Sequence, residues 1–151
     1  MTTITVGELL YEYTAKITGM TEYGVSFADL MAGTTAPPPE GARFDVIFAG
    51  TSTGPKLKGE VSGVDYVRVR ADGRFDLHIH AAITTDDGQR ISLHADGLAL
   101  PQPGSPIAGL RENVTLFTSS KAYTWVNGLQ IWAIGTVDLA EQVVRISGYS
   151  A

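Results

Sequence analysis

The three histidines of the chain, His78, His80 and His94, are its best candidates for chemistry near neutral pH, because imidazole titrates there. His78 and His80 alternate along one predicted strand. A three-residue loop at residues 86–88 pairs apolar with apolar side chains across the hairpin, whereas a two-residue loop pairs apolar with polar ones. The longer loop sets His80 opposite His94 and His78 opposite Asp96. The sequence therefore predicts all three imidazoles on one face.

Three interpretations of this polar face remain open. Its other members are Tyr66, Arg68, Asp76 and Asp96. A strand face that meets solvent is polar without any function. If the face lines a lumen, His80 and His78 could act as base and acid, with Tyr66 as a hydrogen-bond donor. A His-x-His pair with a third histidine is also a zinc-binding donor set, so His78, His80 and His94 are a candidate metal site.

Asp65 interrupts an apolar face that it shares with Val67 and Val69, opposite Ile79. A carboxylate in such surroundings is either hydrogen-bonded or has a raised pKa, and groups of this kind are frequent in functional sites. Asp65 is therefore a candidate for holding or orienting a proton. The alternative is a structural Asp that bonds the backbone at the start of its strand, after Gly63.

Aromatic residues near the end of the chain predict a surface for an apolar molecule. An Asn-Gly dipeptide at Asn127 indicates a two-residue hairpin turn, which sets Tyr123 opposite Trp132 and Trp125 opposite Gln130. Aromatic side chains with a few polar groups are typical of small-molecule pockets. The candidate substrate-binding residues are Tyr123, Trp125, Asn127, Trp132 and Arg145. An aromatic corner of the core is the alternative.

Short strands must position these residues. Apolar and polar residues alternate along most of the chain, and 17 glycines interrupt the pattern, as in antiparallel sandwiches and barrels. A loop at residues 71–73 forms a second hairpin like that at 86–88. Further strands are expected at residues 9–18, 22–27, 43–49, 57–61 and 142–149. About eight to ten strands in one all-β domain favour a closed antiparallel barrel, because closure removes exposed edges.

Two loops complete the expected elements. Residues 28–41 contain three consecutive prolines, which exclude helix and central strand. This stretch is either a lid over a binding site or a plain surface connection, and a short helical turn is expected at residues 27–31. A four-residue loop at 138–141 sets Trp132 opposite Ser147 and Ile134 opposite Arg145.

Composition and charge narrow the function. The 151 residues suit one domain, residues 1–151, and the net charge of −5 lacks the basic footprint of proteins that bind nucleic acid or anionic membrane. The absence of cysteine excludes disulfides, thiolate chemistry and cysteine zinc sites. No phosphate-binding loop, nucleophile elbow or dinucleotide fingerprint is present, so no cofactor is expected. No apolar leader opens the chain, which predicts a cytoplasmic protein.

Residues 41–97 resemble the DUF3237 family, also called UPF0311. The matching pieces are Gly54-Pro55, Gly59, Gly63-Val64-Asp65-Tyr66, Asp72-Gly73 and Thr85-Asp86-Asp87-Gly88. The segment Tyr123-Thr124-Trp125-Val126-Asn127 is similar to the family's Tyr-x-Trp-Leu-Asn. The resemblance implies a calycin-like (lipocalin-like) barrel and a homodimer, with no established general activity.

Two positions depart from the family pattern. Tyr66 stands where the family usually has Trp, and His80 stands where it usually has Arg. An imidazole in place of a fixed cation changes the chemistry available near neutral pH. The resemblance also favours turning the face of Tyr66, His78 and His80 into the barrel.

Three functions agree with these observations. The first is a cofactor-independent lyase, isomerase or cyclase that acts on a small apolar molecule, with His80 and His78 as base and acid. In that enzyme Asp65 holds a proton, Tyr66 or Tyr123 donates hydrogen bonds, and the tryptophans form an apolar wall. The second is a carrier barrel without chemistry. The third is a metal-dependent enzyme that uses the three histidines.

Overall fold

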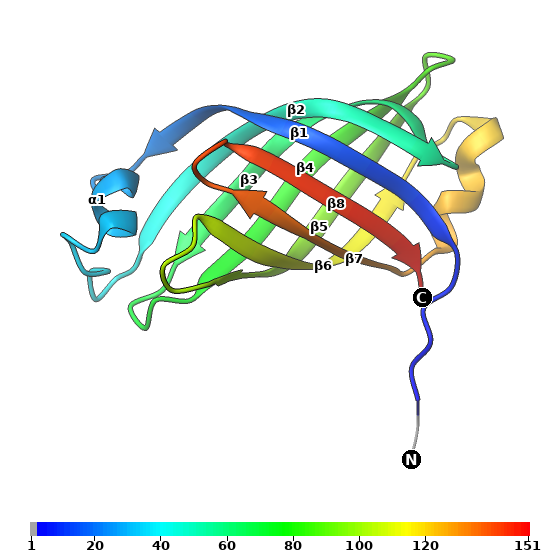
Figure 1. Cartoon of the computed structure of the whole chain (residues 1–151). Coiled ribbons are helices and arrows are strands. Elements are labelled where there is room, and N and C mark those ends of the chain that lie inside the picture. The colour runs from blue at the N-terminus through cyan, green and yellow to red at the C-terminus, as the bar shows by residue number, and fades with distance from the viewer. Residues whose placement is uncertain (1–2) are drawn as a thin grey trace.

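Eight antiparallel strands close into a barrel in the computed structural model, which describes residues 3–151 (Figure 1). Each strand pairs with the next along the chain, and the last pairs with the first. The strands are β1 (Leu9–Glu22), β2 (Ala42–Pro55), β3 (Lys58–Val69), β4 (Phe75–Thr85), β5 (Arg90–Pro101), β6 (Ile107–Phe117), β7 (Ile131–Asp138) and β8 (Val143–Ser150). The predicted all-β closed antiparallel barrel is confirmed.

The hairpin that carries the histidines has the predicted register. Ile83 lies opposite Ile91, and His80 lies opposite His94. Gly88 adopts a φ of 85°, the left-handed conformation that a three-residue loop needs and that glycine adopts without strain. The pairing of apolar side chains was therefore enough to place the three imidazoles relative to one another.

The strand predicted at residues 22–27 is wrong, and the helical turn predicted at 27–31 is confirmed. β1 ends at Glu22, and a turn leads into α1 (Phe27–Ala32). The Ser26 hydroxyl caps this helix by accepting a hydrogen bond from the Asp29 amide at 3.2 Å. Gly33 ends it with a φ of 76°. The proline-rich stretch then returns to β2 without regular structure.

The hairpin predicted at Asn127 is wrong, and so are the pairings of Tyr123 with Trp132 and of Trp125 with Gln130. Residues Lys121–Gly128 form the 3-10 helix η1. The Asn127 amide group bonds both backbone groups of Thr118. Its Oδ1 accepts from the Thr118 amide at 2.9 Å, and its Nδ2 donates to the Thr118 carbonyl at 2.8 Å. The Asn127 side chain therefore takes the place of a paired backbone and closes the loop between residues 118 and 127. These two hydrogen bonds outweigh the preference of the Asn-Gly dipeptide for a hairpin turn.

The register between β7 and β8 is shifted by two residues from the prediction. Trp132 lies opposite Tyr149 and Ile134 opposite Ser147, because pairing begins at Asp138 and Val143. The connecting loop has the predicted length but lies one residue later in the chain. A shift of two keeps every side chain on its predicted face.

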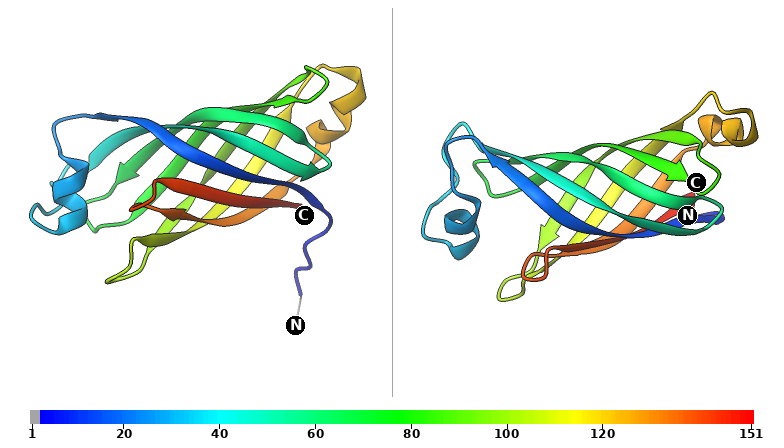
Figure 2. Two further views of the ribbon diagram at one scale, coloured as in Figure 1. Left: turned by 45° about the horizontal axis from the view of Figure 1, so that its top comes forward. Right: turned by 90° about the horizontal axis from the view of Figure 1, so that it is seen from above.

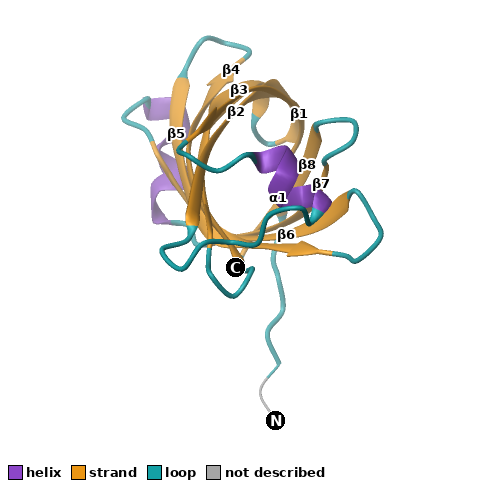
Figure 3. Cartoon of the chain, turned by 90° about the vertical axis from the view of Figure 1, so that its left-hand side faces the viewer, coloured by secondary structure: helices purple, strands orange, loops and turns teal. Residues whose placement is uncertain are grey.

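The two short helices lie at opposite ends of the barrel, as all the views agree (Figure 2). The view into one end shows α1 at the mouth, on the side of β7 and β8 (Figure 3). The inner faces of the strands form an apolar core, whose largest fully buried side chains are Tyr11, Phe44, Leu57, Ile83, Ile91 and Ile131. Within residues 3–151, no helix has the length and apolar character needed to cross a membrane.

Candidate functional site

The histidine face lies outside the barrel, so the expectation that it lines the lumen is wrong. His78 and His80 are exposed and His94 is half-buried, while Leu77 and Ile79 on the alternate positions of β4 are buried. The inner face takes the larger apolar side chains because burying them stabilises the fold. The composition alone had favoured this outcome.

The histidines of the predicted polar face nevertheless lie close together. The His78 and His80 ring centroids lie 4.9 Å apart, and His94 lies 5.1 Å from the first and 5.0 Å from the second. The Tyr66 ring is 5.7 Å from that of His80. The Nδ1 atom of His78 is 2.8 Å from Oδ1 of Asp96. These groups could move protons or bind ions at the surface, but they do not face the cavity.

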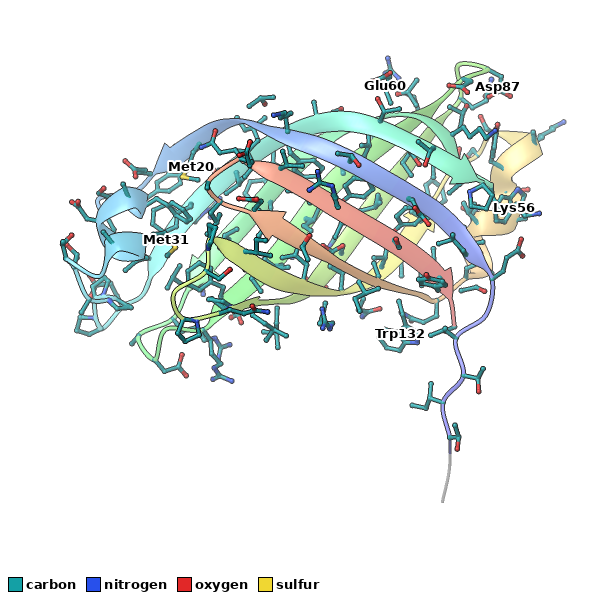
Figure 4. The ribbon with its side chains drawn as sticks, in the orientation of Figure 1. Met20, Met31, Lys56, Glu60, Asp87 and Trp132 are labelled. Atoms are coloured by element: carbon teal, nitrogen blue, oxygen red, sulfur yellow. The ribbon has the colours of Figure 1, made fainter. Side chains whose placement is uncertain are left out.

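The predicted substrate-binding residues are not brought together in one pocket. Trp125 on η1 is 44% exposed and Trp132 on β7 is 42% exposed, and Figure 4 shows Trp132 on the outside of the barrel. Arg145 is also exposed on the outer face of β8. The hydroxyl of Tyr123 donates to Asp87 at 3.0 Å and thereby attaches η1 to the β4–β5 loop. Asn127 has the structural role described above.

The lumen holds a cavity of about 80 Å³. Its wall is apolar apart from Asp65, Glu112 and the hydroxyl of Tyr13, and it contains no Lys, Arg or His. The lining residues are Tyr13, Ile17, Met20, Phe27, Val46, Phe48, Asp65, Leu77, Ile79, Ala99, Leu110, Glu112, Val137, Leu139 and Val144. Two carboxyl groups therefore face one apolar cavity without a cation in its wall to neutralise them.

Asp65 has a raised pKa and a structural hydrogen bond, but it is not at a strand start as the sequence suggested, because β3 begins at Lys58 and the bonded amide lies on β4. It lies opposite Ile79 on the inner face of β3, as predicted. Its Oδ1 accepts a hydrogen bond from the His78 amide at 3.0 Å, which is a structural role. Burial nonetheless raises the pKa of Asp65 to about 6, against the lowering effect of that hydrogen bond.

Glu112 is the site residue that the sequence analysis missed. It lies on the inner face of β6 and is only 5% exposed. Burial, with a smaller effect from the charge of Asp65, raises its pKa to about 8. No hydrogen bond to its carboxyl group is found among residues 3–151. The signal was present in the sequence, because Glu112 interrupts the alternating apolar series Ala108, Leu110, Val114 and Leu116 just as Asp65 interrupts its own.

Two buried tyrosines lie near Glu112, and one of them lines the cavity. Tyr13 lines the cavity, and its ring stacks on Phe48 at 6.3 Å and on Tyr11 at 6.1 Å. The pKa of Tyr13 is raised, first by burial and then by the nearby charge of Glu112. The hydroxyl of Tyr11 is buried without a hydrogen-bond partner in the described residues. Both phenols therefore stay protonated and can only donate or accept hydrogen bonds.

α1 lies at the mouth above the cavity (Figure 3). Phe27 reaches the cavity wall and meets Phe44 edge-to-face at 5.0 Å. α1 also borders a groove of about 600 Å³, whose other walls come from residues 101–108, from Leu139 and from the region where β3 ends and β4 begins. Leu139 lines both spaces. Leu139 is therefore the residue that the groove and the lumen cavity have in common.

Known structures share this architecture. A protein of unknown function from Clostridium acetobutylicum is 21% identical with a TM-score of 0.76, covering 95% of this chain and 96% of its own. A β-barrel-like protein from Acinetobacter baumannii is 21% identical with a TM-score of 0.73, covering 95% of this chain and 93% of its own. A protein described as an enzyme, from Penicillium herquei, is 22% identical with a TM-score of 0.61, covering 99% of this chain and 98% of its own.

No curated protein matches the chain. The model of one family does match it, over residues 25–150, and that family is described as "Protein of unknown function (DUF3237)". This range contains both lumen carboxyls, the histidine cluster and all strands but the first. The chain is a member of the DUF3237 family.

Proposed function

We propose that the barrel binds a small, mostly apolar molecule in its lumen and acts on it as a cofactor-independent acid–base enzyme of the lyase, isomerase or cyclase type. The observation that carries the proposal is the pair Asp65 and Glu112 on one apolar cavity wall. Buried carboxyls without a balancing cation destabilise a fold, and such groups cluster at functional sites. The histidines, which are outside the barrel, have no part in this chemistry.

The two carboxyls have different tasks. Near neutral pH, Glu112 with its pKa of about 8 holds its proton, whereas Asp65 with its pKa of about 6 has mostly released it. Environments that separate the pKa values of two neighbouring groups assign one as acid and the other as base. Asp65 would take a proton from carbon, and Glu112 would give its proton to the substrate oxygen that gains the electron pair. Return of the proton from Asp65 to a different carbon of the enol, with return of the hydroxyl proton to Glu112, completes an isomerisation and restores both carboxyl groups.

The apolar wall determines the kind of substrate. Phe27, Phe48 and Leu77 offer only dispersion contacts, so affinity comes from burial of apolar surface. The present cavity holds only a few heavy atoms, so a larger substrate requires α1 to move outward. A solved structure with the same barrel belongs to a protein described as an enzyme, so this fold is compatible with catalysis.

Exchange of carbon-bound protons tests the proposal directly. Cyclohexanone and related small ketones are incubated with the protein in D₂O, and loss of the α-proton signals is followed by NMR. We expect exchange above the buffer rate with the wild type and a loss of about 100-fold or more in Glu112→Gln and Asp65→Asn. Glu60→Gln is the matched control, because Glu60 is an exposed carboxyl on the outside of β3 (Figure 4).

The same experiment distinguishes the carrier function. Binding of the ketone, seen by ligand-observed NMR, without exchange in any variant would indicate a carrier barrel. Exchange that persists in both carboxyl variants would contradict the acid–base assignment. A protein that binds none of the ketones would contradict the choice of substrate class.

A further inference from the structure

His78, His80 and His94 form a compact triangle of donors on the outer face of the barrel. His78 and His80 are two residues apart on β4, so both point outward, and His94 lies opposite His80 on β5. A ring nitrogen from each residue can be chosen so that all three lie within 4.8 Å of one another. The triangle rests on β4 and β5, which are hydrogen-bonded to each other along this stretch.

We propose that these three imidazoles bind a divalent transition-metal ion such as Zn²⁺. Neutral imidazole nitrogen is a preferred ligand of this ion, and three histidines with an open fourth position are a known catalytic donor set. Zinc–nitrogen bonds of about 2.0–2.1 Å in a tetrahedral site require nitrogens about 3.3 Å apart. The nitrogens therefore need to approach by at most about 1.5 Å, which side-chain rotation of the exposed His78 and His80 can provide.

Asp96 already orients one ligand. Its Oδ1 atom lies 2.8 Å from Nδ1 of His78. An ionised carboxylate can only accept a hydrogen bond, so this contact favours the proton on Nδ1 and leaves the lone pair of Nε2 for a metal ion. Ligating histidines commonly have such a carboxylate partner, which fixes the tautomer and raises the basicity of the ligand. Asp96 and His94 both lie on β5, so this strand contributes two side chains to the site.

The other two imidazoles make ring contacts but no hydrogen bonds in the described structure. Within residues 3–151, no hydrogen bond to the ring of His80 or His94 is found. A bound cation would accept the ring-nitrogen lone pairs that make no hydrogen bond within the described residues. The site is separate from the lumen, so it does not depend on the acid–base proposal.

Titration calorimetry with Zn²⁺ on untagged, chelator-treated protein tests this site. We expect binding that saturates at one ion per chain and that weakens by about 10-fold to 100-fold in Asp96→Asn. Asp76→Asn is the matched control, because Asp76 is an outer-face carboxylate on β4 that pairs with Arg70. His80→Ala and His94→Ala should each reduce affinity more than Asp96→Asn does.

Thermal unfolding gives a second readout. A ligand that binds only the folded state raises the melting temperature with its concentration, so Zn²⁺ should raise that of the wild type and not that of the triple His-to-Ala variant. The exposed His80 gives an informative single variant even if removal of the half-buried His94 weakens the fold. Zn²⁺ binding of unchanged affinity in His80→Ala, or no binding by the wild type, would overturn the proposal.

Discussion

At the scale of single residues, one carboxyl group has the largest expected effect on the behaviour of the protein. Glu112 is buried on an apolar wall and gains no hydrogen bond from the described residues. Its environment therefore favours the neutral form, which is a stability effect as well as a catalytic one. Asp65 differs because a backbone amide partly compensates its charge.

The Glu112→Gln variant should change the dependence of stability on pH. The pKa of Glu112 is raised to about 8 in the folded state, so the unfolded state loses the proton first as pH rises. Its stabilising contribution is therefore present below about pH 4.5 and is lost as pH rises toward about 8. We expect Glu112→Gln to gain stability relative to the wild type by a few kcal/mol between those limits.

Urea unfolding at about pH 5 and about pH 8 measures this difference. Glu60→Gln removes the same formal charge from the outer surface and controls for net charge. A difference between wild type and Glu112→Gln that stays constant over this range would show that the carboxyl ionises freely in the folded protein.

At the scale of elements, side chains rather than turn propensity decide how β6 connects to β7. Asn127 uses both ends of its amide group on the Thr118 backbone, and Tyr123 attaches η1 to the β4–β5 loop through Asp87. These bonds hold η1 as a lid on one barrel end, opposite α1. The Tyr-x-Trp-x-Asn segment of the family resemblance therefore has a structural role in this chain.

Asn127→Ala should lower the free energy of unfolding by about 2 kcal/mol, because it leaves two partly buried backbone groups without partners. Asn127→Asp keeps the acceptor for the Thr118 amide and loses the donor for its carbonyl, so an intermediate loss is expected. Thermal and urea unfolding of the three proteins would measure the order. Equal stability of Asn127→Ala and the wild type would contradict the role of this side chain.

At the scale of the whole molecule, closure of the sheet gives the barrel an inner and an outer surface, and each surface has one of the proposed sites. The inner surface contains the carboxyl pair, and the outer surface contains the histidine triangle. Beside that triangle, the apolar side chains Leu98, Trp132 and Ile134 are exposed over β5 to β7 and line one groove. Exposed apolar groups of this kind are frequent at protein interfaces.

The homodimer implied by the family resemblance remains a prediction, and this outer groove is where we expect the second copy. Light scattering should give about twice the chain mass of 16.1 kDa for the wild type and the monomer mass for Trp132→Glu, since a buried charge opposes association. Trp125→Glu is the matched control, because Trp125 is equally exposed but lies on η1 outside that groove. A monomeric wild type would contradict the prediction.

The sequence by itself determined the barrel, the β4–β5 hairpin and the relative positions of the three histidines. Those features depend on alternation and on local turns, where each apolar residue must meet another across the strand. The sequence could also have identified both lumen carboxyls, since Asp65 and Glu112 each interrupt an apolar face.

Only the tertiary structure decided which face is inside, and that the two carboxyls share one cavity. β3 and β6 are not neighbours in the sheet, so no pairing rule relates Asp65 to Glu112, and only closure of the barrel brings them to the same lumen. The connection through η1 was decided in the same way, because the Asn127 bonds to Thr118 form only when the end of β6 is in place. The alternation of apolar and polar residues predicts which residues pair on adjacent strands. Contacts across the lumen form only when the whole barrel has closed.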